Sequence, residues 1–289
     1  MIWAVAARKA SPGATTLAAL LAQLWPGPDR RLLLEADPDG GALAARWHAD
    51  LGVTHDPGLL SLAASRDGDV ADRASLHSQP VTQLVDLIAA PPGPAQVVAS
   101  LRALGEDAPR AAARDPRTWV VDCGRLGPSS PSLPWARQAV GALLVVRPRL
   151  DEVVALRPVA ESLRSLDVTA GVVCVGATPF HPLEVAEQVG LPLLGVVADD
   201  RSGAELVEHG LDGRALVRSR LARSVAELAC SLADTAGDRV EAQDDESEAP
   251  ARAVGARRPW RPRRARVVPR ADEPMGADGD AVLVTDGDR

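Results

Sequence analysis

Short apolar runs alternate with longer amphipathic stretches along most of the chain. The apolar runs are typical of strands that are buried on both faces of a parallel sheet. We expect these strands at residues 2–6, 31–35, 83–90, 119–122, 139–146 and 168–175. Apolar residues at helical spacing predict helices at 15–25, 43–47, 59–64, 95–104, 150–166, 183–189 and 214–233. This alternation predicts an α/β fold, with a doubly wound, mostly parallel sheet and helices on both of its faces.

Composition supports a globular body without adding a specific chemistry. The 289 residues are enough for one large α/β domain or two smaller ones. Aromatic residues make up only 2% of the chain, so we expect Ala, Val and Leu to fill the core. Three widely spaced cysteines, with no CxxC pair, imply neither a disulfide framework nor a zinc site.

Charge and hydropathy bear on location. The net charge of −7 argues against a general attraction to nucleic acid. The sequence has neither a signal-peptide pattern nor a run of about 18 apolar residues. These features predict a soluble, cytoplasmic protein, and peripheral attachment to the inner face of a membrane stays open.

The charge pattern changes at Gly237. Residues 238–248 hold six acidic residues and one arginine, whereas residues 252–270 hold eight arginines and no acid. Such charge blocks with Pro and Gly predict disorder, so the expected domain covers residues 1–236 and residues 237–289 form a charged tail. The Arg-rich block could bind anionic membrane, nucleic acid or a protein partner. The alternative, which we favour, is a solvated tail whose blocks screen each other.

Residues 8–16, with the sequence RKASPGATT, join the first strand to the first helix. A helix N-terminus offers unpaired N–H groups and the positive end of the helix dipole, which suit an anion. Gly13 tolerates backbone angles that other residues resist, and the Thr15 and Thr16 hydroxyls suit capping or a metal ion. An ordinary capped helix is the alternative, because the strict phosphate-loop pattern fails where Ala14 replaces its lysine.

The stretch resembles the deviant Walker A motif of the MinD/ParA family, Lys-Gly-Gly-x-Gly-Lys-Thr-Thr. Lys9 falls on the signature lysine, Gly13 on the third glycine, and Thr15 and Thr16 on the hydroxyl pair. Ala14 replaces the phosphate-binding lysine, as is frequent in the similar TadZ/CpaE-like branch. Lys9 is also the only lysine among the 32 basic residues of the chain.

Two departures and one gap accompany this resemblance. Ala10 and Ser11 stand where the family has glycines, and we expect them to resist positive φ. Pro12 has no N–H to offer a phosphate. After the strand at 168–175, Gly176 begins a Gly-Ala-Thr-Pro segment in place of the Asn that reads adenine in the family, so base recognition has no support.

Two further segments carry the resemblance. The run from Glu35 to Gly41 is similar to the family's Asp-x-Asp-Pro-x-Gly motif, which implies that Asp37 positions the attacking water and that Glu35 replaces an aspartate near the metal. An ordinary Asp-Pro-Asp-Gly turn is the alternative. Asp122 ends an apolar strand, as in a Walker B site, where the acid holds Mg²⁺ through water while the Thr15 hydroxyl binds the ion directly.

The resemblance covers about residues 1–235 and implies a P-loop NTPase-like fold and a nucleotide-dependent switch that positions a secretion or pilus machine, a septum or DNA. It implies ATP and Mg²⁺ as cofactors, a nucleotide site of Lys9, Gly13, Ala14, Thr15 and Thr16, and a homodimer in which Lys9 reaches the partner's phosphates. The loss of the lysine at Ala14 predicts weak ATP binding and slow or no hydrolysis. The alternative is a pseudo-ATPase scaffold that binds protein partners without nucleotide.

We expect truncation after residue 236 to leave the thermal unfolding transition unchanged, because a disordered tail adds no packing to the folded body. Thermal denaturation of the full chain and of the truncated chain checks this. A large loss of melting temperature in the truncated chain would show that the tail packs on the body.

Overall fold

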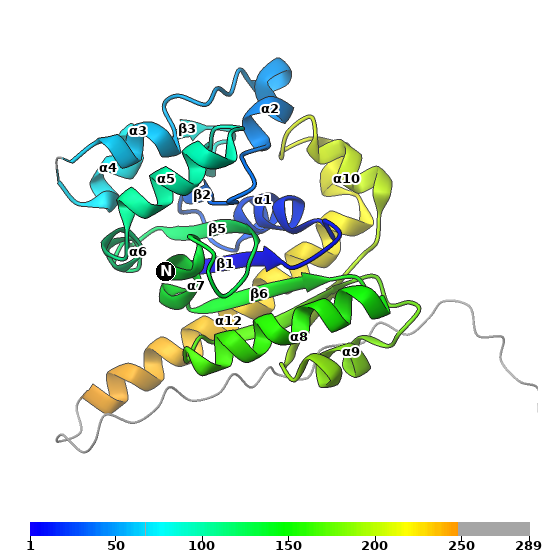
Figure 1. Cartoon of the computed structure of the whole chain (residues 1–289). Helices are drawn as coiled ribbons and strands as arrows, with labels where there is room; N and C mark the ends of the chain where they lie inside the picture. Colours follow the sequence, from blue (N-terminus) through cyan, green and yellow to red (C-terminus); the bar gives the residue numbers. More distant parts are fainter. Residues whose placement is uncertain (67, 248–289) are drawn as a thin grey trace, which may run out of the picture.

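The computed structural model describes residues 1–66 and 68–247, with side chains up to residue 237. Most of the predicted tail, residues 248–289, lies outside the described residues. The strands are β1 (Ile2–Ala7), β2 (Arg31–Glu35), β3 (Gln79–Pro80), β4 (Val85–Ile88), β5 (Thr118–Arg125), β6 (Gly141–Val146), β7 (Ala170–Val175) and β8 (Leu193–Val197). They form one sheet in the order β3-β4-β2-β5-β1-β6-β7-β8, and only β3 is antiparallel to its neighbour (Figure 1). The predicted mostly parallel sheet is confirmed.

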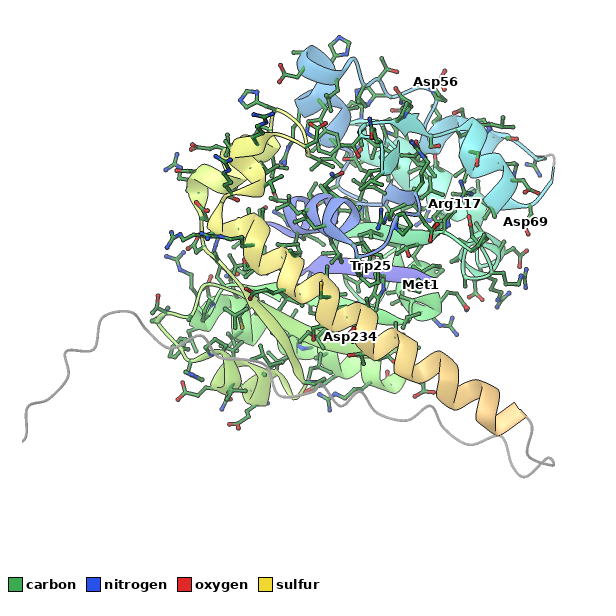
Figure 2. The ribbon with its side chains drawn as sticks, turned by 180° about the vertical axis from the view of Figure 1, so that it is seen from behind. Met1, Trp25, Asp56, Asp69, Arg117 and Asp234 are labelled. Carbon is green, nitrogen blue, oxygen red and sulfur yellow. The ribbon has the colours of Figure 1, made fainter. Side chains whose placement is uncertain are left out.

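Helices cover both faces of the sheet. One face carries α3 (Leu59–Ala64), α4 (Val70–Leu76), α5 (Pro94–Leu104), α6 (Asp107–Ala112), α7 (Leu133–Gln138), α8 (Leu150–Ser165) and α9 (Pro182–Val189). The other carries α1 (Ala14–Leu24), α2 (Leu43–Leu51), α10 (Arg201–Val207), α11 (Arg214–Val217) and α12 (Arg220–Ser247). Figure 2 shows α12 crossing this second face beside α1.

The apolar runs are continuous because each strand packs on both sides. In β1 the side chains alternate between the two cores: Ile2, Ala4 and Ala6 join one, and Trp3, Val5 and Ala7 join the other. All of these residues are at most 3% exposed. A polar side chain at any of these positions would be buried in a core without a hydrogen-bond partner. Both faces of the strand must therefore be apolar.

Tryptophan contributes more to the core than the composition suggests. Trp3 packs against Trp25 in one core, with ring centroids 5.5 Å apart, and Trp119 stacks on Trp135 in the other at 5.8 Å. Trp47 is also fully buried. Ala, Val and Leu make up most of the core, as expected, and a few large rings add much buried apolar area despite their low number.

The predicted helix at 214–233 is divided into α11 and α12. The division lies where Asp200 accepts hydrogen bonds at Oδ2 from the N–H groups of Arg220 and Leu221, at 3.0 and 3.2 Å. The Ser219 hydroxyl accepts another from Ala222, at 3.0 Å. These side chains satisfy N–H groups that a continuous helix would pair internally, so a new helix begins at residue 220.

Helix α12 continues to Ser247, so the predicted domain boundary at residue 236 falls inside a helix. Ala236, which is 3% exposed, is the last residue described as buried. The helices α4, α6, α7 and α10 were absent from the sequence prediction, because each has only six or seven residues between turns and too few apolar positions to define a period.

Asp200 also caps α10, since its Oδ1 accepts from the Gly203 N–H at 3.0 Å. We expect Asp200→Ala to lower the free energy of unfolding by about 1–2 kcal/mol, because two helices lose their N-terminal acceptor. Urea unfolding measures this, and Asp199→Ala, at the exposed neighbouring carboxylate, is the matched control. Equal losses in the two variants would contradict the capping role.

The contribution of the Asp200 carboxylate to the free energy of unfolding should depend on pH. The Gly203 N–H, as the largest cause, lowers the pKa of Asp200 below its ordinary value. Asp200 therefore stabilises the fold above its unfolded-state pKa, and this stabilisation is lost as the pH falls through the lowered pKa. The stability difference between wild type and Asp200→Ala should shrink accordingly in acid.

Candidate functional site

Four parallel strands, β2, β5, β1 and β6, end side by side at one edge of the sheet (Figure 1). Asp122 in β5 lies in register with Glu35 in β2 and with Val5 in β1. The strand ends that carry the three predicted motifs therefore meet. Ligands bind at this edge in open α/β sheets, beside the loops that leave the carboxyl ends of the strands.

The loop of residues 8–13 has an unusual backbone. Gly13 has φ +99°, and Ala10 and Ser11, which carry Cβ atoms, have φ +62° and +48°. A non-glycine residue in this left-handed region costs roughly 1–2 kcal/mol. The expectation that Ala10 and Ser11 avoid positive φ is therefore wrong, and the loop holds a shape that glycine would adopt more easily.

The loop leads into the N-terminus of α1. Gly13 precedes Ala14, the first residue of the helix, and no side chain caps this end. The first intrahelical bond runs from the Leu17 N–H to the Gly13 carbonyl at 2.8 Å. The N–H groups of the first turn are therefore available to an anion, and the helix dipole favours a negative charge there.

The Thr15 side chain lies beside the Asp122 carboxylate, close enough to lower its pKa. Asp122 is 1% exposed; its Oδ1 accepts from the Gly124 N–H at 3.0 Å, and its Oδ2 has no hydrogen-bond partner among the described residues. Burial, as the largest cause, and the charge of Asp37 together raise the pKa of Asp122 to about 7. A buried acid with an unpaired oxygen is suited to a cation or a water.

Asp37 lies over Gly124, two residues beyond Asp122. A Cβ atom on Gly124 would come within 1.9 Å of the Asp37 carboxyl carbon, and Gly124 has φ +54°. The Asp37 carboxylate accepts a hydrogen bond from the Asp39 backbone N–H at 2.9 Å. Burial raises the pKa of Asp37, and the nearby backbone N–H of Arg125 opposes that rise. Only glycine leaves room for this carboxylate, so β5 holds Asp37 and Asp122 at the same site.

Glu35 is held by the backbone. Its Oε1 accepts from the N–H groups of Ala42 and Leu43, both at 2.8 Å, and its Oε2 accepts from Ala90 at 3.0 Å. Burial raises the pKa of Glu35, and these three N–H groups oppose that rise. The carboxylate therefore fastens the N-terminus of α2 and the end of β4 to β2, and its role near a metal stays a prediction.

Lys9 does not point into the loop in this structure. Its Nζ donates to Asp151 at the start of α8, at 3.0 Å, and both side chains are more than half exposed. The hydrogen bond from Lys9 lowers the pKa of Asp151. An exposed pair of this kind contributes little to stability, so Lys9 can leave it at small cost. Nothing in the sequence pattern pointed to Asp151.

The residues present fit a magnesium ion accompanied by an anion. The described residues hold no cluster of three His, Cys, Asp or Glu side chains suited to a metal. Mg²⁺ instead keeps several waters and is bound by one or two protein oxygens together with phosphates. The Thr15 hydroxyl and the unpartnered Oδ2 of Asp122 offer that oxygen set beside the α1 N-terminus. Thr16 follows on the same turn and is partly exposed.

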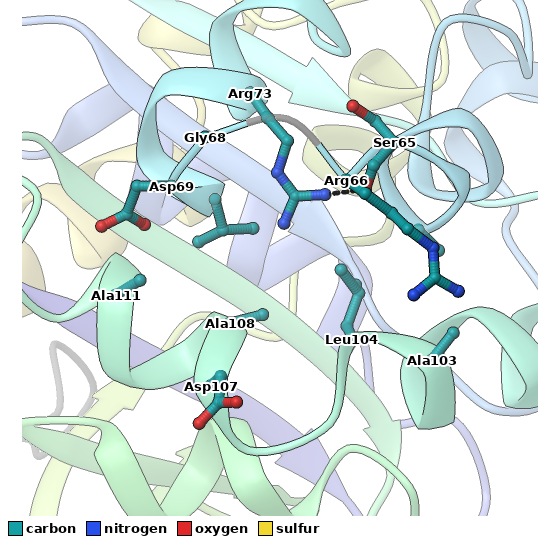
Figure 3. Close-up of a pocket in the computed structure, with 12 residues that line it drawn as sticks. Ser65, Arg66, Gly68, Asp69, Arg73, Ala103, Leu104, Asp107, Ala108 and Ala111 are labelled. Atoms are coloured by element: carbon teal, nitrogen blue, oxygen red, sulfur yellow. Dashed lines mark hydrogen bonds between the residues drawn. The ribbon is translucent and has the colours of Figure 1, made fainter.

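A hollow of about 350 Å³ lies elsewhere, between α4, the end of α5, α6 and the loop after α3 (Figure 3). Arg73 reaches across it, and its Nη1 donates to the carbonyls of Ser65 and Leu62. These carbonyls belong to the end of α3, where intrahelical partners are missing. Arg73 therefore caps the C-terminal end of α3. The residues that line the hollow do not include the α1 N-terminus.

No protein-family model matches the sequence, and comparison with curated proteins gives no match. Solved structures do match. The septum site-determining protein MinD of Pyrococcus horikoshii, complexed with Mg-ADP, has a TM-score of 0.66 and 19% identity over 83% of this chain and 99% of its own. A ParA family ATPase from Chlorobium tepidum has a TM-score of 0.63 and 18% identity over 80% and 98%.

A third match, a plasmid partition protein of Borrelia burgdorferi bound to AMPPNP, has a TM-score of 0.58 and 13% identity over 78% of this chain and 96% of its own. The chain has the MinD/ParA ATPase fold. The predicted resemblance is confirmed at this level, and the TadZ/CpaE-like branch stays a prediction. Gly176 follows β7 directly and has φ +76°. Its backbone N–H donates a hydrogen bond to the Val197 carbonyl at 2.9 Å.

The raised pKa of Asp122 gives a stability prediction. The folded protein binds this proton more tightly than the unfolded chain, so its ionisation destabilises the fold as the pH rises from 3.8 to about 7. Without Mg²⁺, we expect Asp122→Asn to exceed wild type in free energy of unfolding at pH 8 by about 1–3 kcal/mol, and by less at pH 5. Urea unfolding at both pH values measures this.

Asp39→Asn, which changes an exposed carboxylate nearby, is the control for Asp122→Asn. It should follow the wild-type pH dependence. If Asp122→Asn follows that dependence as well, the buried carboxylate is not the group that titrates.

Proposed function

We propose that this protein is a nucleotide-dependent switch for spatial organisation, which binds Mg-ATP weakly at the α1 N-terminus and hydrolyses it slowly or not at all. Within the MinD/ParA-like proteins, we place it nearest the TadZ/CpaE-like branch, because its phosphate loop lacks the same lysine. The cargo is a secretion or pilus machine, a septum or DNA.

The observation that carries this proposal is the position of the Thr15 side chain beside the buried Asp122 carboxylate, at the end of the positive-φ loop. A hydroxyl on the first turn of a helix, next to an unpartnered buried carboxylate oxygen, offers the ligands of a hydrated magnesium ion. The free N–H groups of the same turn suit the phosphates. The fold shared with MinD complexed with Mg-ADP adds support at the level of architecture.

Weak binding follows from charge. A lysine at position 14 would add a charge-assisted contact worth roughly 1.5–3 kcal/mol, so its absence weakens the affinity about tenfold or more. Ala14 is 7% exposed and carries no polar group. Pro12, which is buried, withholds one N–H from the loop. Three carboxylates at this edge, Glu35, Asp37 and Asp122, add negative charge that bound Mg²⁺ would neutralise.

Hydrolysis would depend on Asp37. Its carboxylate accepts a hydrogen bond from the Asp39 N–H, and burial raises its pKa above the ordinary value. A carboxylate held in this way can orient a water with an oxygen that the backbone leaves free. The missing lysine reduces stabilisation of negative charge in the transition state, so we expect turnover to be slow.

Dimerisation would depend on Lys9. Its ion pair with Asp151 is exposed and exchangeable, and the loop has no lysine of its own at position 14. A Lys9 arriving from a second subunit would supply positive charge to the phosphates. Nucleotide binding and dimerisation would then be coupled in both directions.

The partners of the structural neighbours indicate the range of cargo. One neighbour is a MinC:MinD cell division complex from Aquifex aeolicus, and others are plasmid partition proteins. For this chain we propose a protein partner in a secretion, pilus or division machine. Contact with nucleic acid or anionic membrane through the Arg-rich residues 252–270 is a weaker proposal, and no described helix is long and apolar enough to cross a membrane.

The alternative function is a pseudo-ATPase scaffold that keeps the fold and binds proteins without nucleotide. The replacement of the lysine by the buried Ala14 favours it. The two functions differ in one measurable property, which is affinity for Mg-ATP.

Calorimetry with Mg-ATP at high protein concentration tests the proposal. We expect a micromolar dissociation constant and a dimer by sedimentation in wild type, and tighter binding with less dependence on protein concentration in Ala14→Lys. Lys9→Ala should abolish ATP-dependent dimerisation and leave the monomer folded.

Asp151→Ala is the matched control, because it breaks the same ion pair and keeps the lysine. It should dimerise as readily as wild type. No heat and no dimer in wild type at millimolar Mg-ATP would establish the scaffold instead.

A further inference from the structure

The proposed nucleotide site lacks a cation within its own subunit at the position of Ala14. Lys9, the signature lysine, is bound to Asp151 in this structure. The nearby carboxylates make the deficit larger, because Glu35 lies in register with Asp122, and Asp37 packs against Gly124 two residues beyond it. The fold brings another basic side chain to the loop.

Arg147 is such a residue. It follows β6 directly, and β6 lies beside β1, with Leu144 in register with Ala6. The first residues beyond these two strands are therefore neighbours. The Arg147 Nη1 lies 3.5 Å from the Ala10 carbonyl oxygen, so its guanidinium reaches the positive-φ segment of the loop.

The backbone around Arg147 is fixed. Its N–H donates to the Glu152 Oε2 at 2.9 Å, and its carbonyl accepts from the Arg149 N–H at 2.7 Å. Glu152 is 2% exposed, and Pro148 is buried between the two arginines. The turn thus holds the Arg147 Cα in place, and only the side chain has to move to meet a ligand.

The present contact of the guanidinium is weak. At 3.5 Å, the hydrogen bond to Ala10 is at the limit of a real one, and Arg147 is only partly buried. Exchanging a carbonyl at this distance for a phosphate oxygen replaces a weak contact with a charge-assisted one. The planar guanidinium matches a phosphate through two N–H groups, which gives geometry as well as charge.

We propose that Arg147 supplies, within the same subunit, the positive charge that Ala14 withholds, by binding the phosphates of a nucleotide at the α1 N-terminus. This inference rests on the proposed function. It divides the work between two cations: Arg147 sets the affinity of the monomer, and Lys9 sets the dependence on a second subunit. The site keeps its anion specificity although the loop has lost its lysine.

The test measures binding of Mg-ATP, with a fluorescent ATP analogue and Mg²⁺, at protein concentrations too low for dimerisation. Arg147→Ala should weaken binding roughly ten- to a hundredfold, the loss of one charge-assisted phosphate contact. Arg149→Ala is the matched control, since Arg149 is two residues away, exposed and without a contact to the loop among the described residues; it should bind like wild type.

A double-variant cycle separates charge from structure. If Arg147 acts through its charge, Arg147→Ala in the background of Ala14→Lys should cost several-fold less than in wild type, because the new lysine replaces it. An equal loss in both backgrounds would show a structural role and overturn the proposal. The thermal transition without ligand checks that each variant is folded.

Two further outcomes are decisive. If wild type binds Mg-ATP and Arg147→Ala binds equally well, the role of Arg147 is refuted and the proposed function stands. Arg8, the first residue of the loop, is the other basic side chain to test. If Arg8→Ala weakens Mg-ATP binding and Arg147→Ala does not, the role of Arg147 is likewise refuted and the charge belongs to the loop itself. If wild type binds no Mg-ATP at millimolar concentration, the proposed function and this inference fail together.

Discussion

The Thr15 side chain at the start of α1 lies beside the Asp122 carboxylate of β5, and the chemistry of the site depends on this approach. Burying an aspartate at 1% exposure is costly unless something compensates its charge, and here one carboxylate oxygen has no partner among the described residues. The Asp37 carboxylate packs against Gly124, two residues beyond Asp122 in β5, and brings a second acid to the site. The sheet therefore creates an electronegative corner next to the electropositive end of a helix. Such a corner is complete only with a cation and an anion together.

The fold could be predicted from the sequence because its strands are buried on both faces. A strand such as β6, residues 141–146, is apolar throughout because it is buried on both faces, and this makes it visible without any partner being known. The short helices α6 and α7 could not be predicted, since they pack by a few alanines and Trp135 rather than by a repeated stripe. The break before α12 was equally hidden, because its cause, Asp200, lies twenty residues earlier in the chain.

The candidate site was partly predictable for a similar reason. Thr15, Asp37 and Asp122 each end or follow a strand, so parallel topology alone brings them to one edge. The contacts of Lys9 with Asp151 and of Arg147 with Ala10 depend on which strands are neighbours in the sheet and on side-chain directions, and neither is encoded in local spacing. For Glu35, the sequence showed the charge but not the contacts. Its three backbone N–H donors come from segments that only the fold brings together.

The backbone of the loop bears on the choice between a switch and a scaffold. Ala10 and Ser11 hold positive φ although each carries a Cβ, at a cost of roughly 1–2 kcal/mol per residue. Both residues are exposed, so the packing of the core does not demand this shape. Strain of this kind collects where a ligand is bound, because there the shape has a use beyond folding. A surface that bound only other proteins would gain nothing from a cradle around the N–H groups of α1. The strained loop and the N–H groups of the first turn of α1 lie at the same edge of the sheet as the unpartnered oxygen of Asp122, and together they favour a nucleotide over a scaffold without one.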